Sequence, residues 1–425
     1  MLKTDPLDRS FGFLKKNLET MPLQKRQDYL NQKLRGIIQY AYRHSIAFKE
    51  KLDSVGLKPK DIQTIKDLEK IPITKKADLV ELQKKNPPFG GLEGVPISEL
   101  KRIYISPGPI YEPGEMEYNE LGWAQGMYAG GFRPGDIVVN TFSYHMVPFA
   151  LHMVDNSLQR IGCVVIPTGV GNTEQQVHIL KTLKATGFCG TPSFLLNIAE
   201  KAVEMGLDPK RDLHLKVGFV AAEMLPESLR ANLEEKFGMV IRQTYGTADI
   251  GCLGYECMKK NGMHIPDDKI VEIVDPETGK QLGPGKTGEI VATSFNKVYP
   301  LIRFGTGDLS ILTETPCPCG RTSPRLIKIL GRVDQVTKVR GLFVHPGQVD
   351  EVASRHSQIG RYQVVVTRKD HKDEMTFRIE LKEEVSQPER LKEEIERTIR
   401  EVIKVRGEVE FIPKGTIPEL SLIHI

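Results

Sequence analysis

The sequence has few of the features that mark specialised classes of protein. Its 425 residues include one tryptophan and six cysteines, and no segment is dominated by one or two residue types. No apolar run approaches the roughly 18 to 20 residues of a membrane-spanning helix, and residues 1–6 lack the apolar core of a signal peptide. The net charge is only +4, with both signs interspersed, which argues against a surface dedicated to nucleic acid or to a membrane. We therefore expect a cytoplasmic protein that acts on small molecules.

The scarcity of cysteine limits the redox chemistry. Six cysteines in a chain of this length suit a reducing compartment, so we expect no structural disulfides. Cys317 and Cys319 are separated by one residue, a spacing that is awkward for an intramolecular disulfide and that suits a metal ion. The hydrophobic share of 40% and the charged share of 27% are ordinary for a globular protein. The length exceeds what a single core supports, which predicts two or more domains.

The first half of the chain changes from helical to alternating character. Residues 21–55 repeat apolar side chains at three-to-four spacing, which predicts packing helices, and Thr74 is expected to cap a further helix over residues 75–84. From Arg102 on, strands alternate with helices of about 10 to 15 residues, with the stretch 106–114 as a turn. This alternation predicts βαβ units in a largely parallel sheet, whose ligands lie beyond the carboxyl ends of the strands.

The second half is richer in strands. After Tyr245, the stretches 269–274 and 288–293 are typical of strands in a smaller β subdomain. Beyond Gly341, strands over 362–368, 374–382 and 408–412 and a helix over 389–404 predict an α+β unit of about 90 residues. We therefore expect an α/β protein. A large N-terminal domain with parallel-rich sheets, helices and a β subdomain covers residues 1–331, and a small, mobile α+β domain covers residues 332–425.

Five motifs follow one another in the second half of the chain, each weak alone but specific in this order and spacing. They are Ala221-Ala222-Glu223, Tyr245-Gly246-Thr247-Ala248-Asp249, Thr306-Gly307-Asp308, Cys317-Pro318-Cys319-Gly320-Arg321-Thr322 and Gly331-Arg332-Val333-Asp334. The set resembles the phenylacetate-CoA ligase branch of the AMP-forming acyl-CoA ligase superfamily, over nearly the whole chain. The resemblance implies an enzyme that joins a carboxylic acid to CoA, using ATP and Mg²⁺, through an acyl-adenylate. An aryl acid such as phenylacetate is implied, with small hydroxy or branched aliphatic acids as rivals.

Asp308 follows a glycine-rich turn, where a carboxylate can accept hydrogen bonds from both hydroxyls of a ribose. The alternative is that Asp308 only satisfies amides of the turn. The resemblance implies that Arg332 adds a cation near the ribose or phosphate, the alternative being a surface ion pair. It also implies that Ala221, Ala222 and Glu223 form the turn that contacts adenine, the alternative being a plain strand-end turn.

The resemblance assigns roles within residues 245–249. In the family motif a tyrosine stacks on adenine, a hydroxyl meets phosphate and a carboxylate binds Mg²⁺. Tyr245, Gly246 and Thr247 are implied to contact the nucleotide, but Ala248 stands where the family has its hydroxyl. The shorter Asp249 replaces glutamate and remains a competent hard oxygen ligand.

Two stretches depart from the family, and both concern the adenylation step. Residues 106–113 match the loop that holds the β- and γ-phosphates of ATP, but only Ser106, Gly108 and Pro113 are retained. Two prolines remove amide donors, and Glu112 replaces the family's lysine with a charge that repels phosphate. Near the end, residues 415–418 begin the segment that carries a catalytic lysine, but no lysine follows Pro418.

The resemblance also implies a hinge and a loop that admits CoA. Asp334 matches the hinge, and Lys338, Arg340 and Gly341 match the CoA loop. Without that role, Lys338 and Arg340 would form a solvated basic face.

Two further sites are implied. Cys317 and Cys319 resemble a metal knuckle, with Cys257 and His264 as partners, and this set would make a closed, structural zinc site. The alternative is that the cysteines are small buried hydrophobes. Tyr144 and His145 lie where family members line the acid pocket, although such clusters are more often plain core.

Two classes of function remain open at this point. The first is an acid–CoA ligase with a modified phosphate loop. The second is a degenerate binding protein that holds AMP, an acyl-adenylate or a CoA ester, and an enzyme that performs only the thioester half-reaction lies between them. The partners are the acid and CoA, with no nucleic acid or membrane, and a homodimer is left open.

Overall fold

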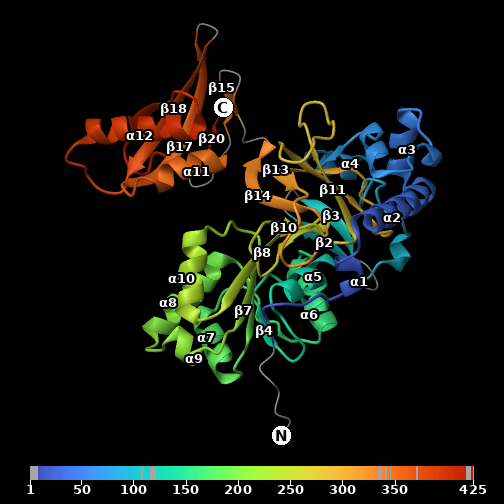
Figure 1. Ribbon diagram of the computed structural model, residues 1–425, viewed down its shortest axis with the longest axis horizontal. Helices are drawn as coiled ribbons and strands as arrows, with labels where there is room; N and C mark the ends of the chain where they lie inside the picture. Colours follow the sequence, from blue (N-terminus) through green and yellow to red (C-terminus); the bar gives the residue numbers. More distant parts are fainter. Residues whose placement is uncertain are drawn as a thin grey trace. The chain divides into compact units, whose positions relative to one another are not determined.

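The computed structural model describes residues 8–106, 109–114, 121–333, 337–339, 342–344, 346–369, 372–417 and 423–424. The chain divides into two compact units. One comprises residues 1–306 and 311–328, and the other comprises residues 307–310 and 329–425. Figure 1 shows both units, which are described separately below.

The first unit begins with a helical layer. Its helices are α1 (Lys16–Glu19), α2 (Leu23–His44), α3 (Ile46–Ser54) and α4 (Leu79–Lys85). Leu34, Ile38 and Ala41 of α2 are fully buried against Phe48 of α3, which accounts for the three-to-four apolar spacing. Ser45 ends α2 and begins α3, because its hydroxyl accepts a hydrogen bond from the amide of Phe48. The helices expected over residues 21–55 are confirmed.

The helix expected over residues 75–84 begins later than predicted. Thr74 and Lys75 form the short strand β1 (Thr74–Lys75), a 3₁₀ turn follows (η3, Lys76–Asp78), and α4 begins at Leu79. Strand β1 pairs in parallel with the start of β13 (Phe304–Thr313). Thr74 is therefore no helix cap: a long-range strand pairing overrides the local capping signal.

A twelve-stranded sheet forms the centre of the fold, in the order β11-β12-β13-β14-β10-β9-β8-β7-β6-β4-β5, with β1 beside β13. Its parallel part comprises β4 (Ile137–Asn140), β5 (Val164–Ile166), β6 (Gly187–Gly190), β7 (Val217–Val220) and β8 (Val240–Thr247). The helices between these strands are α5 (Gly122–Ala129), the π-helix η5 (Phe149–Asp155), α6 (Asn156–Ile161), α7 (Thr173–Thr182), α8 (Pro192–Glu204), α9 (Pro209–Asp212) and α10 (Glu227–Phe237). The predicted βαβ units are confirmed.

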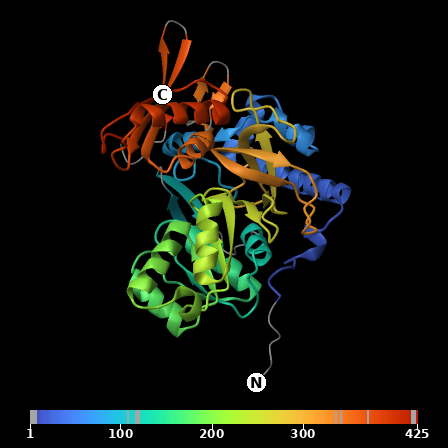
Figure 2. The ribbon, with the colours of Figure 1, turned by 60° about the vertical axis from the view of Figure 1, so that its left-hand side comes forward.

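Helices cover both faces of the parallel strands. Successive residues of a strand point to opposite faces, so Val138 packs with Trp123 of α5 and Leu158 of α6, whereas Val139 packs with helices α7, α8 and α10. Figures 1 and 2 show α7 to α10 gathered on one side of these strands. Burial on both faces explains why the strands are continuous apolar runs.

The remaining strands of the large sheet are mainly antiparallel. They are β9 (Gly251–Glu256), β10 (Met263–His264), β11 (Lys269–Val274), β12 (Thr287–Ser294), β13 and β14 (Arg325–Arg332). Pairing is antiparallel for β8 with β9, β9 with β10, β10 with β14 and β11 with β12. The expected strands over 269–274 and 288–293 are confirmed. They belong to the same continuous sheet as the parallel strands, and the two parts of the sheet join where β9 pairs with β8.

The stretch expected to be a turn at residues 106–114 is largely a β-hairpin. Strand β2 (Arg102–Ser106) pairs antiparallel with β3 (Ile110–Gly114), so that Ser106 faces Ile110 and Tyr104 faces Glu112. Turn residues at 107–109 concealed the second strand in the sequence, because proline is tolerated in an edge strand such as β3.

The second unit is an α+β domain. Its four-stranded sheet has the order β19-β18-β17-β20, formed by β17 (Ile359–Lys369), β18 (Lys372–Leu381), β19 (Glu408–Phe411) and β20 (Ile423–His424). Helices α11 (Pro346–Ser354) and α12 (Pro388–Ile403) and the pair β15 (Thr337–Val339) and β16 (Leu342–Val344) complete it. Leu391, Ile395 and Ile399 of α12 pack with Val364 and Phe377 of the sheet. The predicted elements are confirmed to within a few residues.

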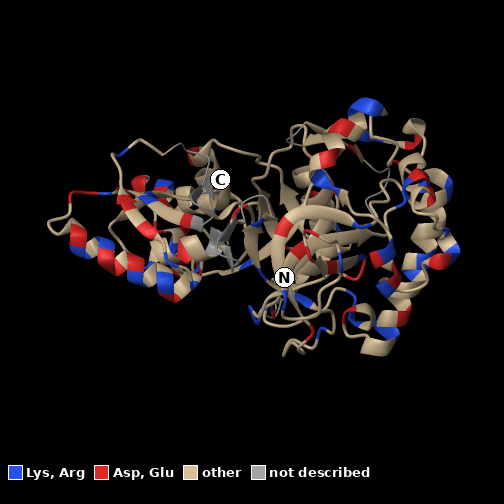
Figure 3. Ribbon diagram, turned by 90° about the horizontal axis from the view of Figure 1, so that it is seen from above, with Lys and Arg blue, Asp and Glu red and all other residues tan. Residues whose placement is uncertain are grey.

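The surface matches the mixed charge of the sequence. Figure 3 shows Lys and Arg interspersed with Asp and Glu over the helices. Among the described residues, no helix combines the length and the apolar character needed to cross a membrane.

Candidate functional site

A strained turn follows strand β7. Ala221 is buried, but Ala222 is exposed and has a φ of 69°, in the left-handed region that residues with a Cβ atom rarely adopt. Glu223 accepts hydrogen bonds from the amide of Ser193 (3.2 Å) and from its hydroxyl (2.8 Å), near the start of α8. Strain of this kind persists only where the surroundings hold it, and it gathers at functional sites.

The end of strand β8 brings Tyr245 and Thr306 together. The Tyr245 hydroxyl donates to Thr306 Oγ1 (3.2 Å), which in turn donates to the carbonyl of Ile290 (3.0 Å). Tyr245 is half-buried. Thr247 lies two residues further on, and its hydroxyl accepts a long hydrogen bond from the amide of Ile250 (3.4 Å).

Gly246 permits the close approach of β8 and β9. A Cβ atom at this position would clash with the carbonyl oxygen of Gly251 and lie 3.1 Å from Cys252 Cα. We expect Gly246→Ala to lower the free energy of unfolding by about 1–3 kcal/mol, because neither strand can move without loss of pairing. Denaturant unfolding measures this. Gly36→Ala is the matched control, since nothing lies within 4 Å of its added Cβ. The control should be stabilising by up to about 1 kcal/mol, and equal effects of the two changes would contradict the argument.

Asp249 has a partner that the sequence did not reveal. Its carboxylate is buried, and Lys76 Nζ donates to Asp249 Oδ2 at 2.6 Å. Strand β1 ends just before Lys76, and its pairing with β13 holds this segment in place. The two residues are 173 positions apart in the chain, so no local pattern links them.

Glu112 is also buried, with 3% of its surface exposed. The Ser106 hydroxyl donates to Glu112 Oε1 at 2.6 Å. Burial, followed by the negative charge of Asp249, raises the pKa of Glu112 to about 8. Glu112 is therefore an internal group fixed beside Asp249 and not a surface charge on a loop.

A cavity of about 420 Å³ adjoins these carboxyl groups. Polar side chains line much of it, among them those of Glu112, Asp249, His152, Ser294 and Lys297. All of its lining residues belong to the first unit.

Asp308 and Arg332 lie together in the second unit. The Arg332 guanidinium is 3.6 Å from Asp308 Oδ1, and a Cβ atom on Gly307 would meet the same guanidinium at 2.9 Å. Gly307 has a φ of 78°, which a glycine adopts without strain. The Asp308 side chain is 18% exposed and that of Arg332 is 44% exposed, so both remain accessible to a ligand.

Tyr144 belongs to a polar network, whereas His145 is exposed. The Tyr144 hydroxyl donates to Asp155 Oδ1 at 2.9 Å, and Asn140 Nδ2 donates to the same oxygen at 2.7 Å. Burial raises the pKa of Asp155, while these two hydrogen bonds lower it. The network fixes the Tyr144 ring, and a Cβ atom added at Gly169 would lie 3.8 Å from its Cδ2 atom.

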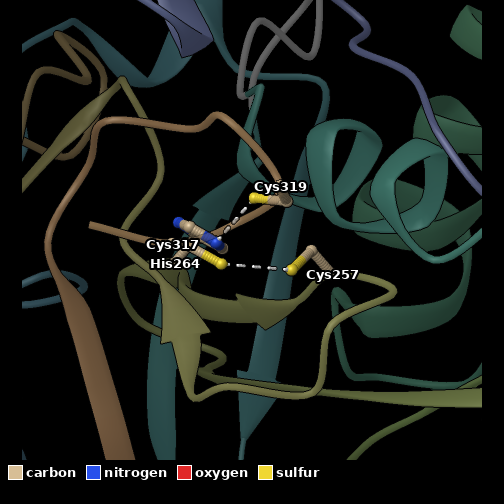
Figure 4. Close-up of side chains that lie close together, drawn as sticks. All are labelled: Cys257, His264, Cys317 and Cys319. Atoms are coloured by element: carbon tan, nitrogen blue, oxygen red, sulfur yellow. Dashed lines mark hydrogen bonds between the residues drawn. The ribbon is translucent and has the colours of Figure 1, made fainter. Parts of the chain in front are cut away.

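Four side chains form a compact cluster in the first unit (Figure 4). The potential ligand atoms of Cys257, His264, Cys317 and Cys319 lie within 4.8 Å of one another, and all four residues are buried. Cys257 Sγ is 3.8 Å from Cys317 Sγ, and Cys319 Sγ is 3.4 Å from His264 Nε2. The second ring nitrogen of His264 lies 3.3 Å from the hydroxyl of Ser323. Hydrogen bonding to Cys319 and burial raise the pKa of Cys257, whereas hydrogen bonds from Cys257 and His264 lower that of Cys319.

The N-terminal segment packs on this cluster. Arg321, two residues beyond Cys319, forms a buried ion pair with Glu19 at 2.8 Å, and its guanidinium lies over the ring of Phe13 at 4.8 Å. The amide of Thr322 donates to the carbonyl of Glu19 at 3.0 Å.

Several predicted site residues lie outside the described residues: Gly108, Asp334, Arg340 and Gly341. Of Lys338 only the backbone is described, in β15. The roles assigned to these residues stay predictions.

Comparison with known proteins identifies the class of enzyme to which this two-unit fold belongs. Residues 118–296 match the model of the AMP-binding enzymes, and residues 341–422 match the model of their C-terminal domain. A solved structure of a 2-hydroxyisobutyryl-CoA ligase, in an open conformation with 2-HIB-AMP and CoA, aligns with a TM-score of 0.85 and 27% identity. The alignment covers 100% of this chain and 96% of that one.

The sequence relatives narrow the class. The chain is 32% identical to the phenylacetate-coenzyme A ligase of Thermus thermophilus, over 94% of this chain and 95% of that protein. It is 31% identical to the ligase of that name from Aromatoleum evansii, over 94% of each. The chain therefore belongs to the phenylacetate-CoA ligase family of AMP-forming acid–thiol ligases.

Proposed function

We propose that the protein activates an aryl carboxylic acid of the phenylacetate type in two steps, adenylation by ATP and then transfer of the acyl group to CoA. The observation that carries the proposal is the 32% identity to a phenylacetate-CoA ligase along almost the full length of both chains. Small hydroxy acids are the rival substrates, since the 2-hydroxyisobutyryl-CoA ligase structure also matches over the whole chain.

The proposal gives each group of residues a role. Tyr245, Gly246 and Thr247, with the turn at 221–223, contact the nucleotide, and Asp308 accepts the ribose hydroxyls. Arg332 supplies a cation for the ribose or phosphate, and Asp249 offers a hard oxygen to Mg²⁺. The fixed ring of Tyr144 lines the acid pocket, together with the adjacent residue His145.

Residues 1–331 act as the nucleotide- and acid-binding domain. Residues 332–425 act as a cap that turns about Asp334, and Lys338, Arg340 and Gly341 then admit CoA.

Zinc is the metal that suits the cluster of Cys257, His264, Cys317 and Cys319. Three sulfur atoms and one imidazole nitrogen, all buried, match the donor set of a closed tetrahedral zinc site. A bound zinc ion would hold the three sulfurs as thiolates and join β10 to the loop before β14, a structural role with no open position for chemistry.

A second candidate function is favoured by one specific observation. Glu112 occupies the position of the phosphate-binding lysine, and no lysine follows Pro418, so the adenylation machinery is altered at two places. An enzyme that performs only the thioester half-reaction would need neither residue.

The two candidates separate in one assay. We expect pyrophosphate and thioester to appear together when the protein is incubated with MgATP, CoA and a panel of aryl, hydroxy and branched acids, with phenylacetate among the best substrates. Pyrophosphate and thioester are followed separately. Thioester formed only from a supplied acyl-adenylate would favour the half-reaction enzyme. The absence of both products from a protein that still binds AMP would leave a binding protein and sink the ligase proposal.

A further inference from the structure

A basic groove adjoins the cavity of the first unit. It has a volume of about 650 Å³ and is lined by residues of helix α2 and of the loop after β12. Four of its lining residues also line the cavity beside Glu112, namely Tyr29, Lys33, Phe295 and Lys297. The groove therefore begins where the cavity ends, and these four residues form the boundary between the two spaces.

The permanently charged side chains that line the groove are all cationic. They are Lys33, Arg43 and Lys297, and the described lining residues include no aspartate or glutamate. All three side chains are exposed, and none forms an ion pair with a described residue. Lys33 Nζ lies 5.6 Å from the centre of the Tyr29 ring, and Lys297 Nζ lies 5.1 Å from that of Tyr40. These ring contacts orient the two ammonium groups but leave their charges uncompensated.

Lys33 and Lys297 are also the cations of the cavity wall that have no carboxylate partner among the described residues. The other charged groups of the wall have polar partners, which are Lys76 for Asp249, Lys269 for Asp268 and Ser106 for Glu112. Lysine carries a compact charge on a flexible stem and is a common ligand of phosphate groups. An anion in the cavity would therefore meet its free positive charge at Lys33 and Lys297.

The place of these lysines in the cavity indicates which anion they suit. Glu112 and Pro113, which line the same cavity, belong to the stretch that matches the family's phosphate-binding loop, and Glu112 stands where the family has a lysine. Lys33 on α2 and Lys297 after β12 supply the positive charge that this stretch lacks, from elements far from it in the sequence. A chain of phosphates carries several negative charges and matches such a set of cations.

We propose that Lys33 and Lys297 bind the polyphosphate chain of ATP and the pyrophosphate that adenylation releases, and that pyrophosphate leaves through the groove past Arg43. The inference rests on the proposed ligase function and adds the residues that hold its leaving group. CoA also carries a diphosphate, but the matching phosphate loop on the cavity wall favours ATP as the source. The substitution at Glu112 is then a relocation of the phosphate-binding charge and not its loss.

The test is calorimetric titration of the full-length protein with inorganic tripolyphosphate at physiological ionic strength, without acid, CoA or metal. We expect Lys33→Gln and Lys297→Gln each to weaken tripolyphosphate binding by about 10-fold, because each removes one charge-assisted hydrogen bond. Lys25→Gln is the control, since Lys25 is an exposed lysine of the same helix that lines neither space, and it should bind as the parent does. All three side chains are exposed, so we expect the variants to fold.

Titrations with ATP, AMP and CoA separate the possible sources of phosphate. Both variants should weaken ATP binding by about 10-fold and leave binding of AMP and CoA unchanged, because AMP lacks the β- and γ-phosphates. A loss for CoA as large as that for ATP would assign the groove to CoA and overturn the proposal. It would also be overturned if both variants bound tripolyphosphate as tightly as the parent, or if Lys25→Gln lost as much affinity as they did. Tripolyphosphate binding needs no acid, so a protein that fails the ligase assay can still pass this test, and the two failures are distinguishable.

Discussion

A protein carrying Cys317→Ser and Cys319→Ser together is expected to lose about one equivalent of zinc per chain and to unfold far more easily than the parent. Both sulfurs belong to the buried cluster with Cys257 and His264. Serine cannot replace a thiolate as a zinc ligand, and loss of a structural metal is among the few changes that cost on the order of 4 kcal/mol. Zinc content is measured by atomic emission and stability by denaturant unfolding.

The control is a cysteine of the same core outside the cluster. Cys163 is buried, and its thiol lies 3.4 Å from the carbonyl oxygen of Arg133. Cys163→Ser should keep its zinc and lose only the modest stability of a buried thiol. If the double variant retains its full metal content, the cluster is not a zinc site and its cysteines are core residues.

The second large effect is expected at Asp308. Asp308→Ala should weaken binding of AMP by about 100-fold or more, because hydrogen bonds to a charged group contribute about 1.5–3 kcal/mol each and a ribose offers two hydroxyls. Asp308→Asn should lie between the parent and the alanine variant, since its amide keeps one acceptor oxygen. Calorimetric titration with AMP measures both.

Asp53→Ala removes an exposed carboxylate that is paired with Lys58 in the first unit, and it should leave AMP binding unchanged. If Asp308→Ala binds AMP as tightly as the parent does, the Asp308 carboxylate does not bind the ribose. Its role is then limited to hydrogen bonds within its own turn and to the contact with Arg332. A loss of stability without a change in AMP affinity would lead to the same conclusion.

Local sequence patterns predicted the fold where burial repeats along one element. In residues 21–55, the apolar stripe marks the buried face of each helix. In the strands that contain Val139 and Phe219, a continuous apolar run indicates burial on both faces. The cluster of Cys257, His264, Cys317 and Cys319 was also predicted from the sequence, because the spacing of Cys317 and Cys319 resembles the metal-binding motif of the family.

Pairings between distant segments were not predictable in this way. Thr74 carries a capping signal, yet it joins β13 as a strand residue. Lys76 is one of several lysines in its segment, and only the fold brings it to Asp249, which lies 173 positions away. The charge of Glu112 was visible in the sequence, but its burial against Ser106 was not, because the hairpin that places it contains turn residues.

The attachment of the N-terminal segment to Arg321 has a practical consequence. Phe13 and Glu19 contact the guanidinium of Arg321, two residues beyond Cys319, so the described part of the N-terminal segment covers this side of the cysteine cluster. Shortening the chain at this end, or proteolysis within the segment, would open the cluster to chelators. If the cluster holds zinc as proposed, the rate at which a chelator removes the ion would report on the integrity of this segment, and a protein trimmed there would be purified with less zinc than the parent.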